Sequence, residues 1–143
     1  MSEIVRTTGR YLLAVTVLNL FWELAHLPLY TIWTTGSARE NLFAVLHCTV
    51  GDAMIATITL VTALVVCKAR HWPRSRFLAV ALLAILFGLG YTIFSEWRNT
   101  TVTMSWTYAS AMPRVFGIGL SPVAQWLVVP GVVFWWIRRS MAS

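Results

Sequence analysis

Apolar residues run through this chain in four long, nearly uninterrupted blocks, at positions 11–33, 42–67, 77–97 and 120–137. Each block is about as long as the roughly 20 residues that a helix needs to cross the hydrocarbon core of a bilayer. Membrane strands are shorter and alternate apolar with polar positions, which these blocks do not. The pattern therefore predicts an all-α integral membrane protein, a four-helix transmembrane bundle that forms a single domain over residues 1–143.

The composition supports a membrane location. Apolar residues make up 58% of the chain and charged residues 11%, whereas a typical soluble domain has about 45–50% and about 25%. So few charged side chains cannot cover the surface of a globule this small. The composition thus excludes a soluble enzyme, a nucleic-acid-binding domain and a disulfide-stapled secreted domain, and it makes the lipid bilayer the first partner of the chain.

Positive charges are concentrated at one end of the predicted helices. Of the 11 lysine and arginine residues, eight lie before the first block, between the second and third blocks, or after the fourth. Because cytoplasmic segments are enriched in these residues, we expect both termini in the cytoplasm. The apolar loop 98–119, which we call the lid loop, is then expected to pack over the outer ends of the helices.

Polar side chains occur inside the apolar blocks, where an ionisable group costs roughly 2.5–3.5 kcal/mol at a helix centre. All of them lie toward the outer half of the predicted bundle, and they come from all four helices. They are Asn19, Glu23, His26, His47, Asp52, Glu96 and Gln125. From Thr16 to Tyr30 the polar residues recur at steps of three and four, which predicts that they share one face of the first helix.

A metal site is one interpretation of these residues. Glu23 and His26 form a Glu-x-x-His pair, the unit that di-iron carboxylate bundles use in two copies. One copy is present here, so the candidate is a single transition metal ion. Its ligands would be Glu23, His26, Asp52 and Glu96, because mixed nitrogen and oxygen ligands suit zinc, iron or manganese.

A haem site and a metal-free site are the alternatives. His26 and His47 lie at matched depth on neighbouring antiparallel helices, as the two axial ligands of a b-type haem do. In the metal-free alternative, Glu23 and Asp52 are the catalytic groups, because burial favours a neutral carboxyl that can both accept and donate a proton. A site between the helices beneath the lid loop could then admit a small apolar or lipid-like molecule. The candidate cofactor-binding residues are His26, His47 and Gln125.

A structural role remains open beside these chemical ones. In that interpretation the buried polar groups only lock the packing of the helices. The chain would then be a non-enzymatic accessory subunit in a homo-oligomer or a larger membrane complex.

Three segments carry a resemblance to known proteins: residues 21–30 (FWELAHLPLY), 46–52 (LHCTVGD) and 119–126 (GLSPVAQW). With these segments the chain resembles a group of uncharacterised small four-span bacterial inner-membrane proteins, which implies the fold and the location. The stretch around Glu23 is also similar to the sigma-2 receptor and sterol isomerase family, whose members have intramembrane acids and bind sterol-like ligands. This second resemblance implies no residue roles.

Overall fold

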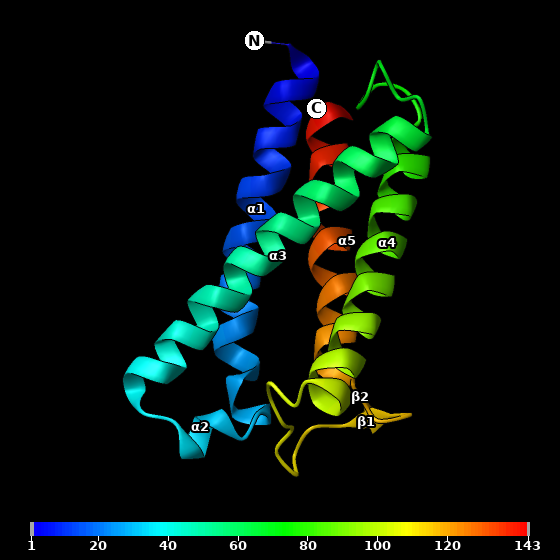
Figure 1. The fold of residues 1–143 in the computed structure, drawn as a ribbon. Helices are drawn as coiled ribbons and strands as arrows, with labels where there is room; N and C mark the ends of the chain where they lie inside the picture. Colours follow the sequence, from blue (N-terminus) through cyan, green and yellow to red (C-terminus); the bar gives the residue numbers. More distant parts are fainter. Residues whose placement is uncertain (1, 143) are drawn as a thin grey trace.

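Residues 2–142, the part of the chain that the computed structural model describes, contain four long helices (Figure 1). They are α1 (Glu3–His26), α3 (Ala38–Val66), α4 (Phe77–Trp97) and α5 (Leu120–Ala142). Each of them is long and apolar enough to cross a membrane. The prediction of an all-helical protein with four candidate membrane spans is therefore confirmed.

Short elements join the long helices at the end of the bundle far from the termini. A 3-10 turn, η1 (Leu27–Leu29), and the short helix α2 (Ile32–Thr35) connect α1 to α3. A π-helical turn, η2 (Arg98–Val102), continues α4, and an antiparallel hairpin precedes α5. Its strands are β1 (Arg114–Val115) and β2 (Ile118–Gly119).

The first helix ends earlier than expected. The sequence predicts one span over 11–33, but α1 begins at Glu3 and ends at His26, after which the chain turns. The reason is Pro28, which has no backbone N–H to donate and whose ring clashes with the carbonyl of the residue four positions before it. The segment after Leu29 therefore lies across the end of the bundle and does not continue the span.

Helix α3 corresponds to the second apolar block, which predicts a start at residue 42. The helix begins earlier, at Ala38, because Ser37 caps it. The Oγ of Ser37 accepts a hydrogen bond from the Glu40 N–H at 3.3 Å, and Glu40 Oε2 accepts one from the Ser37 N–H at 2.8 Å. This reciprocal capping box satisfies N–H groups that the first turn of a helix leaves without a partner.

The four long helices form a ring in which each packs against two neighbours. The packed pairs are α1–α3, α3–α4, α4–α5 and α1–α5, so that α1 and α4 lie diagonally across the ring. Figure 1 shows α3 crossing the bundle obliquely, with its C-terminal end beside α4. Both ends of the chain lie at the same end of the bundle, together with the loop that joins α3 to α4 (Figure 1).

Apolar side chains occupy both the core and the outer surface of the bundle. The core in the half nearer the termini includes Tyr11, Val15, Leu60, Val80, Val133, Phe134 and Ile137. Large apolar side chains are also exposed on the outer faces of all four helices, among them Leu13, Met54, Leu82 and Leu127. An apolar surface of this extent is what contact with lipid chains requires.

Helices α4 and α5 pack closely against each other at Gly88. A Cβ atom added to Gly88 would lie 2.3 Å from the indole ring of Trp126, far closer than two carbon atoms can be. Trp126 is itself buried. Small residues allow such close approach of helix backbones in membranes, where van der Waals packing is a main source of helix association.

We expect Gly88→Ala to lower the thermal stability of the protein in detergent. The new methyl group forces the Trp126 ring or the two helices apart, at a cost of about 1–3 kcal/mol in the free energy of unfolding. The matched control is Gly90→Ala on the exposed side of the same helix, where an added Cβ meets no atom within 4 Å. Melting followed by circular dichroism should show a lower midpoint for Gly88→Ala alone, and equal midpoints would contradict the close packing.

Candidate functional site

One stripe of α1 carries the first residues of the site. Its buried residues recur at steps of four and three: Thr7, Tyr11, Val15, Asn19, Glu23 and His26. This spacing places them on a single face of the helix. The predicted polar face, from Asn19 to His26, therefore points into the bundle. Toward the termini the same stripe continues with Val15 and Tyr11 in the apolar core.

The Gln125 side chain on α5 joins three helices. Its Nε2 atom lies 3.2 Å from Asn19 Oδ1 and 3.0 Å from Glu23 Oε1, both on α1. The same nitrogen lies 2.9 Å from Asp52 Oδ2 on α3. All four side chains are buried, with exposed fractions between 2% and 8%. The structure thus brings Glu23, Asp52 and Gln125 together, three of the residues that the sequence analysis singled out.

His26 extends this network toward the lid loop. Its Nε2 lies 3.1 Å from Glu23 Oε2, and its Nδ1 lies 2.9 Å from Ser121 Oγ on α5. The indole N–H of Trp22 donates to the same Ser121 oxygen at 3.3 Å. Either tautomer of His26 fits these contacts: Nδ1 accepts from Ser121 while Nε2–H donates to Glu23, or Nδ1–H donates to Ser121 while Nε2 accepts a hydrogen bond from protonated Glu23. We refer to Asn19, Glu23, His26, Asp52, Ser121 and Gln125 as the polar cluster.

The centre of the polar cluster has more acceptors than donors. The amide nitrogen of Gln125 carries two hydrogens but faces three oxygens. Turning the amide over would place its oxygen against these oxygens, which would then need still more protons. A proton on Glu23 or Asp52 would turn one of these acceptors into a donor, and it would also avoid two uncompensated negative charges in a buried site.

Glu96 lies apart from the polar cluster, on α4 beneath the lid loop. Its side chain is buried, and its Oε2 accepts hydrogen bonds from the hydroxyls of Tyr30, at 3.5 Å, and Tyr108. The Tyr108 hydroxyl accepts in turn from the Gly119 N–H at 3.0 Å. Burial raises the pKa of Tyr108, and the hydrogen bond to Glu96 raises it further, so this phenol remains a donor.

Backbone hydrogen bonds hold the lid loop against the turn that follows α1. The Thr31 N–H donates to the Thr107 carbonyl at 3.0 Å, and the Ala109 N–H donates to the Leu29 carbonyl at 2.9 Å. Phe116, at the tip of the β1–β2 hairpin, is fully exposed. The middle of the lid loop therefore lies across this end of the bundle, which we call the lid end, and the hairpin projects from it.

His47 does not belong to the polar cluster. Its side chain is exposed on the outer face of α3, where its ring stacks on Phe43 with the centroids 5.7 Å apart. Asp52, on the same helix, is buried and faces the opposite way. The structure therefore contradicts the interpretation of His26 and His47 as a pair of axial haem ligands, because one buried ring and one outward-facing ring cannot hold one haem.

The predicted metal ligands do not form a metal site. Within residues 2–142, no group of three or more histidine, cysteine, aspartate or glutamate side chains is placed to hold a metal ion. Gln125 bonds to both Glu23 and Asp52, so an amide occupies the place of a metal between the two carboxyls. Glu96 bonds to two tyrosines instead. A metal ion held by Glu23, His26, Asp52 and Glu96 is therefore not supported.

Three contributors to this region received no role from the sequence. Ser121 stands four residues before Gln125, so helical spacing could have placed it one turn from that amide. Trp22 precedes Glu23 and reaches Ser121 from the edge of the same helix face. Tyr108 has no comparable signal, because its contact with Glu96 depends on the path of the lid loop.

We expect Tyr108→Phe to loosen the lid loop. The substitution removes the side-chain acceptor of the Gly119 N–H and one of the two tyrosine donors to Glu96, and loss of a partner costs about 1–3 kcal/mol for a buried group. Hydrogen exchange at the Gly119 amide should accelerate, and the melting midpoint should fall. Tyr91→Phe is the matched control, because Tyr91 is exposed on the same helix as Glu96. Unchanged exchange at Gly119 would show that the hydroxyl does not secure the lid loop.

No family model, curated protein or solved structure matches this chain. The resemblances to small four-span bacterial proteins and to the sigma-2 receptor family therefore stay predictions. The function proposed next rests on the geometry of the polar cluster and its surroundings.

Proposed function

We propose that this chain is a multi-pass protein of the bacterial inner membrane, with both termini in the cytoplasm, whose polar cluster is an acid–base site. The site works without a metal ion: Glu23 and Asp52 hold one proton, and His26 exchanges it toward the lid end. The molecule on which it acts is small and apolar or lipid-like, and enters beneath the lid loop. The observation that carries the proposal is the Gln125 amide nitrogen facing three oxygens, two of them from carboxyls.

A carboxyl pair with one proton is suited to acid–base chemistry. The neutral member can donate a proton and the ionised member can accept one, so both halves of general acid–base catalysis are present at one place. Burial favours a pair with one neutral and one ionised carboxyl over a pair with two ionised carboxyls, because an ionised carboxyl without a strong donor is unfavourable in a low dielectric. His26, bonded to Glu23 at 3.1 Å, is the group through which a proton can leave the pair.

Ionisable side chains extend from the polar cluster toward the lid end. The ring of His26 meets the ring of Tyr30 edge-on, with centroids 5.3 Å apart, and the Tyr30 hydroxyl donates to Glu96. In the other direction the stripe of α1 continues as Val15 and Tyr11, which are packed in the apolar core. This asymmetry favours a site that opens at one end over a channel through the bundle.

An accessory subunit with structural polar groups is the second candidate. The observation in its favour is that Gln125 ties Asn19, Glu23 and Asp52 together, which by itself fixes the packing of three helices. The two candidates differ in one property. An acid–base site must hold a proton that exchanges with the solvent, whereas a structural network need not exchange one.

The orientation can be tested with reporters of membrane side. A reporter fused to the C-terminus and one inserted at Ser75, in the loop between α3 and α4, should both be active only in the cytoplasm. A reporter inserted at Gly117, in the lid hairpin, should be active only outside. The physical reason is the excess of lysine and arginine at the end that holds the termini. The opposite pattern would place the lid end in the cytoplasm.

The bound proton should be visible by infrared spectroscopy. At neutral pH, the protein in lipid is expected to show the C=O stretch of a neutral carboxyl, because the network around Gln125 needs a proton on Glu23 or Asp52. Glu23→Gln and Asp52→Asn should each change or remove this band. Glu40→Gln is the control and should leave it unchanged, since Glu40 is exposed and bonded to the Ser37 N–H.

Transfer to heavy water separates the two candidates. For an acid–base site the carboxyl band shifts as deuterium replaces the proton, and His26→Ala slows the shift because it removes the exchanging group. Glu23→Gln should still fold, since an amide keeps the shape and much of the hydrogen-bonding capacity of the carboxyl. Absence of the band in the parent protein, or exchange that does not depend on His26, would favour the accessory subunit.

A further inference from the structure

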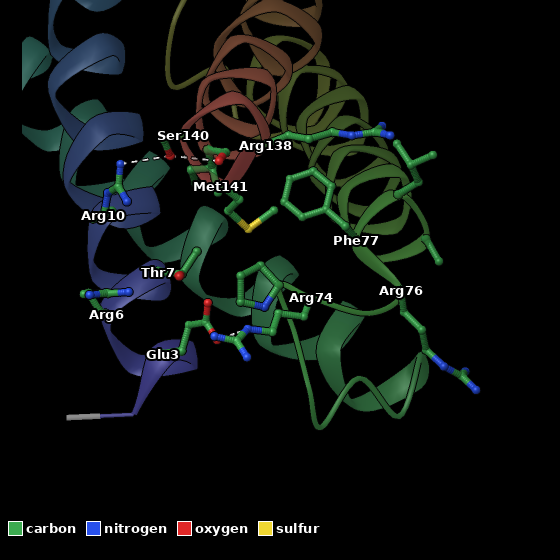
Figure 2. Close-up of a pocket in the computed structure, with 14 residues that line it drawn as sticks. Glu3, Arg6, Thr7, Arg10, Arg74, Arg76, Phe77, Arg138, Ser140 and Met141 are labelled. Atoms are coloured by element: carbon green, nitrogen blue, oxygen red, sulfur yellow. Dashed lines mark hydrogen bonds and ion pairs between the residues drawn. The ribbon is translucent and has the colours of Figure 1, made fainter. Parts of the chain in front are cut away.

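A basic cavity of about 720 Å³ lies at the opposite end of the bundle, beside the termini (Figure 2). Its walls come from the first turns of α1, the start of α4, the last turns of α5 and the loop before α4. The charged residues that line it are Glu3, Arg6, Arg10, Arg74, Arg76 and Arg138. Five positive charges and one negative charge thus line the cavity, although the surrounding protein is predominantly apolar.

The ring of helices explains why the cavity is there. Helices α1 and α4 lie diagonally across the ring. At this end of the bundle α3 lies beside α4, so only α5 lies between α1 and α4. Figure 2 shows Arg6 and Arg10 on the α1 side, Arg74 on the loop near Glu3, and Arg76 extending away from them. The Arg76 guanidinium donates to the Cys67 carbonyl at 2.6 Å, so it is already engaged elsewhere.

Arg10 is held in place before any ligand arrives. Its guanidinium donates to the Ser140 hydroxyl at 3.1 Å and lies over the ring of Trp136, 4.7 Å from the ring centroid. A guanidinium has five N–H groups, and the Ser140 bond uses one of them. Fixing the side chain in advance lowers the entropy that binding must overcome.

A carboxylate already contacts one of the arginines of this cavity. Arg74 Nε lies 2.7 Å from Glu3 Oε2, in an ion pair whose arginine side chain is mostly exposed. Such an exposed pair contributes little to stability. An anion that brings more oxygens can therefore displace Glu3 from Arg74 at small cost.

We propose that this cavity binds the phosphodiester headgroup of an anionic phospholipid, with Arg6, Arg10 and Arg74 as the groups that contact it. The forked donors of arginine suit phosphate oxygens, and basic pockets between membrane helices bind such headgroups. Phe77 and Met141 line the same cavity, and their apolar side chains suit the glycerol and acyl part of a lipid better than a free, fully hydrated phosphate. The site is independent of the polar cluster at the lid end.

Binding titrations in detergent test the proposal with two lipids, phosphatidylglycerol as the anionic probe and phosphatidylcholine as the zwitterionic one. The parent protein should bind phosphatidylglycerol more tightly. The double variant Arg6→Gln/Arg10→Gln should bind it about 25-fold more weakly, at about fivefold for each arginine lost. The matched control is Arg70→Gln/Arg139→Gln, which removes the same charge from the same end but outside the cavity, and should retain the parent affinity.

A variant that binds the lipid more tightly separates the proposal from misfolding, because a misfolded protein would lose affinity. Glu3→Gln should tighten the binding of phosphatidylglycerol, because it removes the competing carboxylate from Arg74, while Glu40→Gln at the other end should not. Equal losses in the two double variants, or equal binding of the two lipids by the parent protein, would overturn the proposal. Displacement of the lipid by glycerol 3-phosphate at matched concentration would also overturn it, and would assign the cavity to a free phosphate.

Discussion

The contacts of the Gln125 amide nitrogen with three oxygens on α1 and α3 are the interaction on which the site depends. Helices in a bilayer gain little from burying apolar surface against each other, so polar bonds and close packing decide how they sit. Gln125 reaches α1 and α3, while its neighbour Trp126 packs against Gly88 on α4. Two consecutive residues thus fix the rotation of α5 against the other three helices, and this rotation aligns Glu23 with Asp52.

The two ends of the bundle have different chemistry. Carboxyl, imidazole and phenol groups gather at the lid end, and guanidinium groups gather at the end that holds the termini. Between them lies an apolar core in which Tyr11 stacks on Phe134 with ring centroids 4.6 Å apart. Because the core separates the two regions, a ligand in the basic cavity and a proton in the polar cluster can be studied one at a time.

Much of the fold was predictable because periodicity and hydrophobicity determine it locally. The four spans follow from apolar blocks, and the shared face of Asn19, Glu23 and His26 follows from their spacing along one helix. His47 matches His26 in depth along the bundle, but the direction of a side chain around its helix decides whether it reaches the site. It stands five residues from Asp52, about 140° around a helix, and it faces outward in the structure.

The remaining features depend on contacts between distant segments, which a single sequence does not reveal. Glu96 was expected beside Glu23 because both lie in the outer half, but the path of the lid loop brings Tyr108 to it instead. The metal interpretation is not supported for a related reason: Gln125 lies between the two carboxyls, and nothing in its position along the chain shows that it does.

The central claim is that the Glu23–Asp52 pair holds one proton in the membrane. Carbon-13 NMR of the protein in lipid, labelled at the aspartate and glutamate side-chain carboxyls, measures this directly, with Glu23→Gln and Asp52→Asn to assign the two signals. The account predicts that at neutral pH one of these carboxyls has the chemical shift of a neutral acid, or that both have the averaged shift of a shared proton. Two fully ionised carboxylates at neutral pH would contradict it.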